Sequence, residues 1–216
     1  EFTIHLQPKI NIKTGKIDGF EALSRWNSST LGNVPPSTFI PLAEQSGNIK
    51  EIDISITRKA LSWLEERLNK GLNVVPIAIN ISPVHFYDEL FLEQFKETIK
   101  EYNVPLHLLK LELTESIELV DFARAKEILT ELKKLGIDSS IDDFGVGFSS
   151  LSYLPKLPFT EIKIDRSFIN SLNDPGMYAV VQTIIQLASN LQMKAVAEGI
   201  ETLEQYVILK NMGCHI

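Results

Sequence analysis

The chain has 216 residues, 44% of them hydrophobic, and a formal net charge of −7 at pH 7. That length and composition predict one globular domain with a sizeable core, and the negative charge argues against binding a nucleic-acid polymer through a broad basic surface. Because Cys214 is the only cysteine, the chain cannot form an internal disulfide or a cysteine-based zinc site.

The first part of the chain predicts a hairpin of two strands. Residues 2–12 and 17–23 are rich in β-forming residues, and Gly15 lies in the short turn between them. Two strands joined by so short a turn pair antiparallel, because a parallel pair needs a long crossover. A loop containing Gly32 and Pro35 is expected to follow.

From residue 37 onwards, helical and strand-like segments alternate. Apolar residues at helical spacing indicate the helices, and short apolar or alternating runs indicate the strands. These patterns predict helices at 39–45, 52–64, 88–102, 121–135, 175–191 (with Val180 on its buried face) and 202–213 (opened by a capping box). They predict strands at 74–81, 108–114, 137–141, 161–165 and 193–197.

This order predicts an α/β fold. Strands that alternate with helices pair in parallel, and these strands, with a further one beginning at 214–216, suggest the eight strands of a TIM barrel. The opening hairpin makes the first strand antiparallel, so we expect a modified TIM barrel; the alternative is an open doubly wound sheet. Because the chain opens on a strand and stops at Ile216, we expect a domain covering residues 1–216 whose last strand is truncated.

Two adjacent aspartates, Asp142 and Asp143, follow the strand predicted at 137–141. Like charges this close disfavour each other's ionisation unless a cation lies between them, and a divalent metal is the simplest such cation. Taken alone, the pair is more typical of a solvated turn, because turns favour Asp and Gly.

Other predicted strands also end on a polar residue. Because side chains alternate along a strand, Asn80, Glu112 and Lys163 point away from their apolar neighbours. Parallel barrel strands all finish at one face, where barrel active sites lie, so solvation alone is a poor explanation for the repetition. The residues expected at this face are Glu21, Asn80, Glu112, Asp142, Asp143, Lys163 and Glu198.

These residue types indicate a site for two metal ions. Carboxylate and amide oxygens without thiolate or imidazole suit Mg²⁺ or Mn²⁺, and the aspartate pair could bind or bridge two ions. Two ions about 3.5–4 Å apart are the usual arrangement for phosphate-ester hydrolysis. Lys163 could hold the attacking water or offset negative charge, and Arg25 could bind a phosphate or, with even odds, form a surface ion pair.

Several motifs resemble, in order, those of the EAL domain family, which is named after Glu21-Ala22-Leu23. The match covers essentially the whole chain. The matching segments are Gln7-Pro8, Glu21 to Trp26, Asn80-Ile81-Ser82, Glu112 to Ser116, Asp142 to Gly145, Lys163-Ile164-Asp165 and Ala197 to Glu201.

The resemblance implies a phosphodiesterase that hydrolyses the bacterial second messenger cyclic di-GMP to linear 5′-pGpG with Mg²⁺ or Mn²⁺. It also implies a TIM barrel with an antiparallel first strand. The implied metal ligands are Glu21, Asn80, Glu112, Asp142 and Asp143. Lys163 would contact the catalytic water and Glu198 would be the general base or a further metal-site group. The implied substrate contacts are Gln7, Arg25 and Asn80, and the implied supporting residues are Glu115, which steadies the loop after the aspartates, and Glu201.

The chain departs from the family pattern at two places and lacks a third feature. Val146 and Phe148 replace a threonine and a tyrosine, so loop anchoring or dimer-linked regulation is expected to differ. The family continues just past Ile216 with a Gln-Gly-Tyr segment. The resemblance further implies a homodimer, with residues 165–169 as a candidate surface, and flanking sensor or diguanylate cyclase (GGDEF) domains. We expect a cytoplasmic domain in a protein that could itself be membrane-anchored.

Three functions fit these motifs. The first is an active phosphodiesterase for cyclic di-GMP. The alternative is a catalytically inactive EAL domain that acts as a cyclic di-GMP receptor, and a weaker third is a barrel hydrolase for another phosphodiester. Inactive members usually lose metal carboxylates or the lysine, whereas this chain keeps Glu21, Asp142 and Lys163, so we expect the enzyme.

Overall fold

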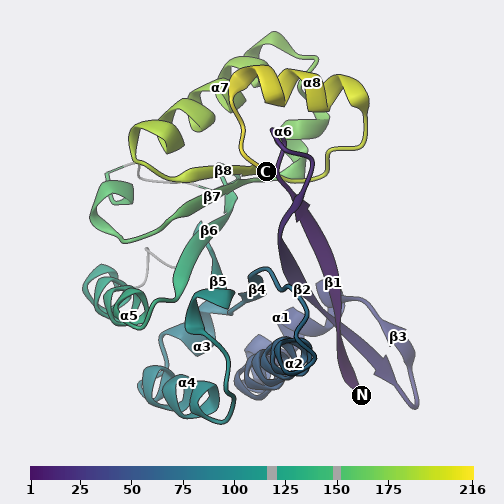
Figure 1. Cartoon of the computed structure of the whole chain (residues 1–216), viewed down its shortest axis with the longest axis vertical. Coiled ribbons are helices and arrows are strands. Elements are labelled where there is room, and N and C mark those ends of the chain that lie inside the picture. Colours follow the sequence, from purple (N-terminus) through teal and green to yellow (C-terminus); the bar gives the residue numbers. More distant parts are fainter. Residues whose placement is uncertain (116–120, 148–151) are drawn as a thin grey trace. The chain divides into compact units, whose positions relative to one another are not determined.

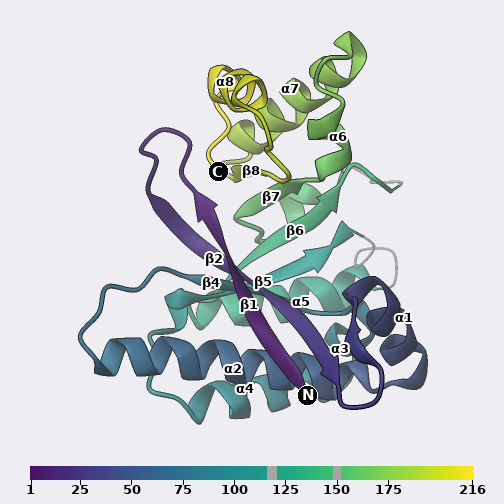
Figure 2. The same cartoon turned by 90° about the vertical axis from the view of Figure 1, so that its right-hand side faces the viewer.

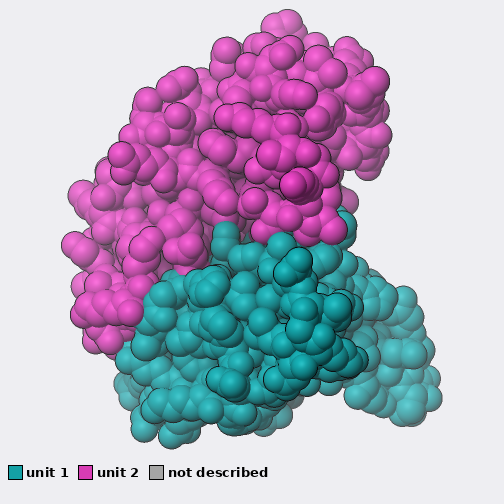
Figure 3. Space-filling model, in the orientation of Figure 1, with its two compact units in different colours: residues 1–8, 19–112, 135–137 teal, residues 9–18, 113–134, 138–216 magenta. Residues whose placement is uncertain are grey.

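The structure, a computed structural model, describes residues 1–115, 121–147 and 152–216. The chain divides into two compact units (Figure 3). Unit 1 comprises residues 1–8, 19–112 and 135–137, and unit 2 comprises residues 9–18, 113–134 and 138–216. Ser116 and Phe148, which belong to the motifs discussed above, lie outside the described residues.

Unit 1 contains most of the two hairpin strands that the sequence predicts, whereas residues 9–18, which include the turn between them, belong to unit 2. The strands of unit 1, in sheet order, are β1 (Phe2–Ile10), β2 (Ile17–Ser28), β4 (Ile77–Asn80) and β5 (Leu109–Thr114). β1 and β2 run side by side in Figures 1 and 2, and the Asn27 N–H donates to the Glu1 carbonyl at 3.1 Å. The first strand is therefore antiparallel to the second, whereas β2, β4 and β5 pair in parallel.

The loop predicted around Gly32 contains a short strand instead. β3 (Gly32–Val34) pairs antiparallel with β2, with Val34 opposite Trp26. β2 consequently extends to Ser28, beyond its predicted end. The Ser28 hydroxyl accepts the Leu31 N–H at 3.2 Å and so closes the turn between the two strands.

The helices of unit 1 follow the predicted order, with two short additions, a helix and a 3₁₀ turn. They are α1 (Pro36–Ser46), α2 (Ile49–Asn69), α3 (Pro83–Phe86), α4 (Phe91–Lys100) and the 3₁₀ turn η1 (Leu106–Leu108). Gly47 ends α1 in the left-handed region at a φ of 77°. α2 buries Ile56, Ala60 and Leu64 as predicted and packs against β4, α3 and α4. The added helix, α3, is too short to produce a periodic sequence pattern.

Unit 2 is built on three parallel strands covered by helices. The strands are β6 (Asp138–Phe144), β7 (Glu161–Ile164) and β8 (Lys194–Ala197). The helices are α5 (Phe122–Lys134), α6 (Arg166–Asn170), α7 (Pro175–Asn190), α8 (Leu203–Met212) and the 3₁₀ turn η3 (Leu154–Lys156). α5 packs on β6, and α7 packs on β7 and β8.

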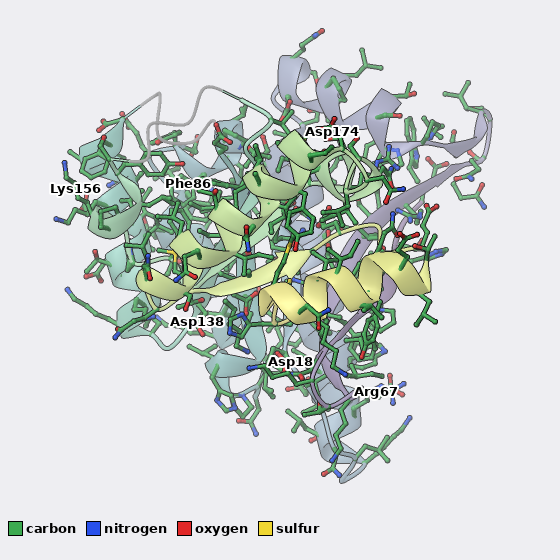
Figure 4. All side chains as sticks on the ribbon, turned by 90° about the horizontal axis from the view of Figure 1, so that it is seen from above. Asp18, Arg67, Phe86, Asp138, Lys156 and Asp174 are labelled. Carbon is green, nitrogen blue, oxygen red and sulfur yellow. The ribbon has the colours of Figure 1, made fainter. Side chains whose placement is uncertain are left out.

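The predicted starts of the last two long helices are confirmed. The Asp174 carboxylate, labelled in Figure 4, accepts the Met177 N–H at 2.9 Å and caps α7. Thr202 and Gln205 form both bonds of the capping box that opens α8. Val180 was predicted on the buried face of α7, and this is wrong because it is 42% exposed; the buried stripe begins one position later, at Val181.

Residues 214–216 were predicted to begin a strand. No strand is assigned there, but the backbone bonds to β8: the Ala197 N–H donates to the Ile216 carbonyl at 2.7 Å and the His215 N–H donates to the Ala195 carbonyl at 3.1 Å. Within the described residues, no helix has both the length and the apolar composition needed to cross a membrane.

The Cys214 thiol is buried, and we expect it to resist modification in the folded protein. Its exposed fraction is 1%, and burial raises its pKa to about 11. Because the thiolate is the reactive form and only about one thiol in a thousand would be ionised at pH 8, the reaction should be slow. Labelling with a thiol reagent should be slow in native protein and complete in denaturant. Rapid stoichiometric labelling of native protein would contradict this burial.

Candidate active site

Unit 1 brings three predicted site residues onto neighbouring strands. Glu21 lies on β2, Asn80 ends β4, and Glu112 lies on β5 directly beside Asn80 in the register. The Asn80 amide donates to Glu21 Oε1 at 2.9 Å. With the amide nitrogen directed at Glu21, the amide oxygen of Asn80 is the atom suited to bind a cation.

Glu112 is a buried carboxylate in an apolar strand. Its exposed fraction is 1%, and its neighbours Leu111 and Leu113 are fully buried. Burying a carboxylate is unfavourable unless hydrogen bonds or a cation compensate it. Because Glu112 is buried, contact with solvent does not explain the polar residue that alternation predicts at this position. A bound ligand such as a cation would explain it.

The centre of unit 2 is a buried lysine between two carboxylates. Lys163 Nζ lies 3.0 Å from Asp142 Oδ1 and 2.7 Å from Glu198 Oε1, and the lysine side chain is 1% exposed. Lys163 lies on β7, between the strands that precede or contain the other two residues. A buried ammonium needs such partners, because an uncompensated charge in a protein interior is strongly destabilising.

The two aspartates lie within β6 and not after it, which corrects the predicted strand end at residue 141. β6 continues to Phe144, but its register with β7 shifts between Ile141 and Phe144, and Asp143 has a φ of 53°. Adjacent side chains of a regular strand point to opposite faces, and a bulge breaks that alternation. Carboxylate oxygens of Asp142, Asp143 and Glu198 consequently all lie within 4.8 Å of one another.

Left-handed backbone at a non-glycine residue is uncommon and is often found at functional sites. At Asp143 it is accompanied by a local hydrogen bond, since the Asp143 N–H donates to Asp142 Oδ1 at 2.9 Å. This bond fixes the Asp142 carboxylate beside the bulge. The arrangement is a rigid group of oxygen donors that could hold a divalent cation.

The segment after the aspartates is held from two sides. Glu115 Oε2 accepts the Gly145 N–H at 2.9 Å, and the supporting role expected for Glu115 towards a metal site stays a prediction. Gly145 has a φ of 94°, and a Cβ there would lie 3.0 Å from the Phe168 ring of α6. Val146 is 61% exposed, so its side chain does not anchor this segment.

Gly199, next to Glu198, is required for packing as well as for its backbone conformation. Its φ is 69°, and a Cβ would lie 2.8 Å from the Cβ of Arg166. We expect Gly199→Ala to destabilise the protein by about 2–3 kcal/mol in thermal or urea unfolding, because strain and a clash add. Gly213→Ala is the control: its φ is 84° but nothing lies within 4 Å, so about 1 kcal/mol is expected. Equal losses would contradict the close contact with Arg166.

Three predicted site residues make contacts away from these groups. Gln7 is exposed on β1. The Arg25 guanidinium donates to the Ser24 carbonyl at 2.8 Å, and the Glu201 N–H donates to the side chain of Gln205 at 2.8 Å. Their expected roles towards a substrate, and that of Glu201 in support, stay predictions.

The segment predicted as a dimer surface forms α6. Asp165 caps this helix by accepting the Ser167 N–H at 3.0 Å, and hydrogen bonds from Ser167 lower the pKa of Asp165 against the opposing effect of burial. Arg166 and Ser167 are exposed, whereas Ile169 is buried. Only part of the segment could therefore contact a partner, and the dimer stays a prediction.

The sequence profile of the EAL domain family matches residues 1–216. The chain is 38% identical over 215 residues to the cyclic di-GMP phosphodiesterase PA2567 of Pseudomonas aeruginosa, covering 99% of this chain and 36% of that protein. It is 36% identical over 211 residues to the oxygen sensor protein DosP of Escherichia coli, covering 97% of this chain and 26% of that protein. The chain thus spans well under half the length of these relatives.

Solved structures of similar sequence share the fold. The structure described as "PaMucR Phosphodiesterase, c-di-GMP complex" matches with a TM-score of 0.93 at 37% identity, covering 99% of this chain and 87% of that chain. The EAL domain of Mycobacterium smegmatis DcpA matches with a TM-score of 0.81 at 31% identity, covering 98% of this chain and 85% of that chain. The predicted α/β fold class, a modified TIM barrel with an antiparallel first strand, is confirmed.

Proposed function

The chain belongs to the EAL domain family, and from this we propose that it is a metal-dependent phosphodiesterase that hydrolyses cyclic di-GMP to linear 5′-pGpG. One observation supports activity above the others: Lys163 lies buried between Asp142 and Glu198, at 3.0 and 2.7 Å. A chain that only bound the messenger would have no need of a buried cation placed among acidic groups, which is costly to build.

We propose that Glu21, Asn80, Glu112, Asp142 and Asp143 are the ligands of two Mg²⁺ or Mn²⁺ ions. The donor set supports this, because it consists of carboxylate and amide oxygens without thiolate or imidazole. When bound, two such ions would activate a water as nucleophile and neutralise charge developing on the phosphate.

The remaining residues would orient the attacking water and accept its proton. Glu198 would accept the proton of the attacking water, and the ammonium of Lys163 at 2.7 Å would keep that carboxylate ionised and oriented until the transfer. Lys163 would also contact this water. Glu115 would keep the Asp142–Asp143 bulge in place through the Gly145 N–H, with Glu201 as further support.

Gln7 and Arg25 are not among the proposed metal ligands and would instead bind the cyclic dinucleotide itself. A guanidinium suits a phosphate, because it offers planar, bidentate hydrogen bonds. Arg25 would have to exchange its present bond to the Ser24 carbonyl for one to the substrate. We expect Arg25→Ala to raise KM for cyclic di-GMP about tenfold with a smaller change in kcat, measured by steady-state kinetics; a change confined to kcat would contradict a binding role.

We further propose that the full-length protein carries flanking sensor or GGDEF domains, acts in the cytoplasm and works as a homodimer. The flanking domains are supported by the small share of PA2567 and DosP that the chain covers, 36% and 26%. A relative of 38% identity is named a bifunctional diguanylate cyclase/cyclic di-GMP phosphodiesterase, MucR of Pseudomonas aeruginosa.

Incubation with cyclic di-GMP tests the proposal. With Mg²⁺ or Mn²⁺, chromatography should show conversion to pGpG, and a chelator should stop it. Tight binding of cyclic di-GMP without turnover in either metal would reject the enzyme and identify the alternative, a cyclic di-GMP receptor. Hydrolysis of other phosphodiesters in preference to cyclic di-GMP would reject the substrate.

A further inference from the structure

Unit 1 contains a buried acidic residue, Asp53, whose carboxylate lies inside the apolar face of α2. Asp53 is 6% exposed, and Ile49, Ile56 and Ala60 of the same helix are also buried. Burial raises the pKa of the Asp53 carboxyl, against the opposing effects of His85 and of the Ser82 N–H. A buried carboxylate persists in a helix only where its partners repay the lost hydration.

The partners of Asp53 all belong to the turn that follows β4. Asp53 Oδ2 accepts the Ser82 N–H at 3.0 Å and lies 3.1 Å from His85 Nδ1. His85 is 1% exposed, and its Nε2 has no hydrogen-bond partner among the described residues. A proton on Nδ1 can be donated to Asp53, whereas a proton on Nε2 would be buried without an acceptor among these residues.

The same turn is tied to α1. The Ser82 hydroxyl donates to Glu44 Oε1 at 2.7 Å and accepts the Val84 N–H at 3.2 Å, which caps α3. Ser82 is thus held through both its backbone and its side chain. Hydrogen bonds from both its backbone and its side chain restrict the position of Ser82 in the protein interior.

Asn80 lies between this turn and the other carboxylates of unit 1. The Ile81 N–H donates to the Glu112 carbonyl at 3.0 Å, and the Asn80 side chain donates to Glu21 at 2.9 Å. The sheet therefore fixes the chain at Ile81, and Asp53 fixes it at Ser82. Only Ile81 separates Ser82 from Asn80, so the position of Ser82 bears on the backbone that carries the Asn80 side chain.

We infer that Asp53 is a positioning residue for the metal site: its bonds to Ser82 and His85 hold Asn80 in the orientation in which its amide oxygen can bind the ion. The inference rests on the proposed function, because it concerns the ligands proposed there. Removal of a residue that contacts and orients a metal ligand typically changes metal affinity 10- to 100-fold. Asp53 acts on Asn80 through Ser82, so we expect an effect at the lower end of this range.

Titration of metal-free protein with Mn²⁺, followed by electron paramagnetic resonance without substrate, tests this. Asp53→Ala should raise the Kd for Mn²⁺ about tenfold. Asp53→Asn should raise it less than threefold, because an amide oxygen in the place of Oδ2 can accept from both the Ser82 N–H and His85 Nδ1. Thr57→Ala is the matched control, since the hydroxyl of buried Thr57 donates to the Asp53 backbone carbonyl at 2.7 Å and not to its carboxylate. It should lower the melting temperature but leave the Mn²⁺ Kd within twofold of wild type.

A Kd within twofold of wild type for Asp53→Ala, or equal losses in Asp53→Ala and Thr57→Ala, would overturn the inference. If Asp53→Ala does not fold, His85→Phe replaces it with an expected rise of about threefold, and an unchanged Kd there would overturn the inference in the same way. Wild-type protein that binds Mn²⁺ but does not hydrolyse cyclic di-GMP would overturn the proposed function alone. Wild-type protein that binds no Mn²⁺ would overturn both.

Discussion

Asp142→Ala should lower kcat/KM for cyclic di-GMP at least a hundredfold while the protein stays folded. Asp142 lies 3.0 Å from Lys163 and within 4.8 Å of the carboxylates of Asp143 and Glu198. Its removal would take a ligand from the proposed metal site and one of the two partners of Lys163. Losses of this size are usual when a group that acts on the reacting centre is removed. Steady-state kinetics and circular dichroism measure the two effects.

Asp138→Asn is the matched control for Asp142→Ala. Asp138 begins the same strand, β6, but its side chain is 43% exposed and pairs with Lys133 at 3.3 Å. Its neutralisation should leave kcat/KM within twofold, because exposed ion pairs contribute little. Glu21→Ala, from unit 1, should match the loss in Asp142→Ala. Unchanged turnover in either alanine variant would contradict the assignment of the metal ligands.

Lys163→Met should lose both activity and stability. The methionine can fill the space of the lysine but leaves Asp142 and Glu198 without the ammonium that they share. Breaking a buried ion pair by removal of one partner typically lowers the free energy of unfolding by about 3–5 kcal/mol. Because the Glu198 side chain is 28% exposed, we expect a loss of about 3 kcal/mol. We expect urea unfolding of metal-free protein to show this loss and hydrolysis to fall at least a hundredfold.

Lys194→Met separates the effect of burial from the effect of removing a lysine. Lys194 also lies in unit 2 and pairs with Asp18 at 2.9 Å, but its side chain is 46% exposed. The pKa of Lys194 is raised by Asp18 against the opposing effect of partial burial. This substitution should cost less than about 1 kcal/mol and leave hydrolysis unchanged. Equal losses of stability in the two variants would contradict a buried, structurally important Lys163.

Sequence periodicity predicted the long elements because their physical causes are local. The apolar stripe of α5 and the capping box of Thr202 and Gln205 need only neighbouring residues, and both are present in the structure. Short elements such as β3 and α3 were missed, since three or four residues show no period. β3 exists because it can pair with β2, which is a tertiary cause.

The site was predicted in composition but not in geometry. Alternation along the strands identified Asn80, Glu112 and Lys163 as polar residues facing a common ligand, yet it could not show that Lys163 bonds directly to Asp142 and Glu198. The bulge in β6 was also missed, because it depends on the register with β7.

The sequence alone did not indicate a role for Asp53. Most aspartates in an amphipathic helix such as α2 lie on its exposed face, and Asp53 was not distinguished from these. Only the turn after β4, which is distant in sequence, makes it a buried residue with partners. A polar residue in the apolar stripe of a helix is the one signal that could have identified it.

In the proposed reaction, water attacks a phosphorus atom of cyclic di-GMP and opens the ring. The most direct test of this reaction is turnover in ¹⁸O-labelled water with Mn²⁺, followed by mass spectrometry of the linear product after a single turnover. We expect pGpG that carries one ¹⁸O in its terminal 5′-phosphate, and no product when a chelator is added. Unconverted cyclic di-GMP, or a linear product without ¹⁸O, would contradict the proposed reaction.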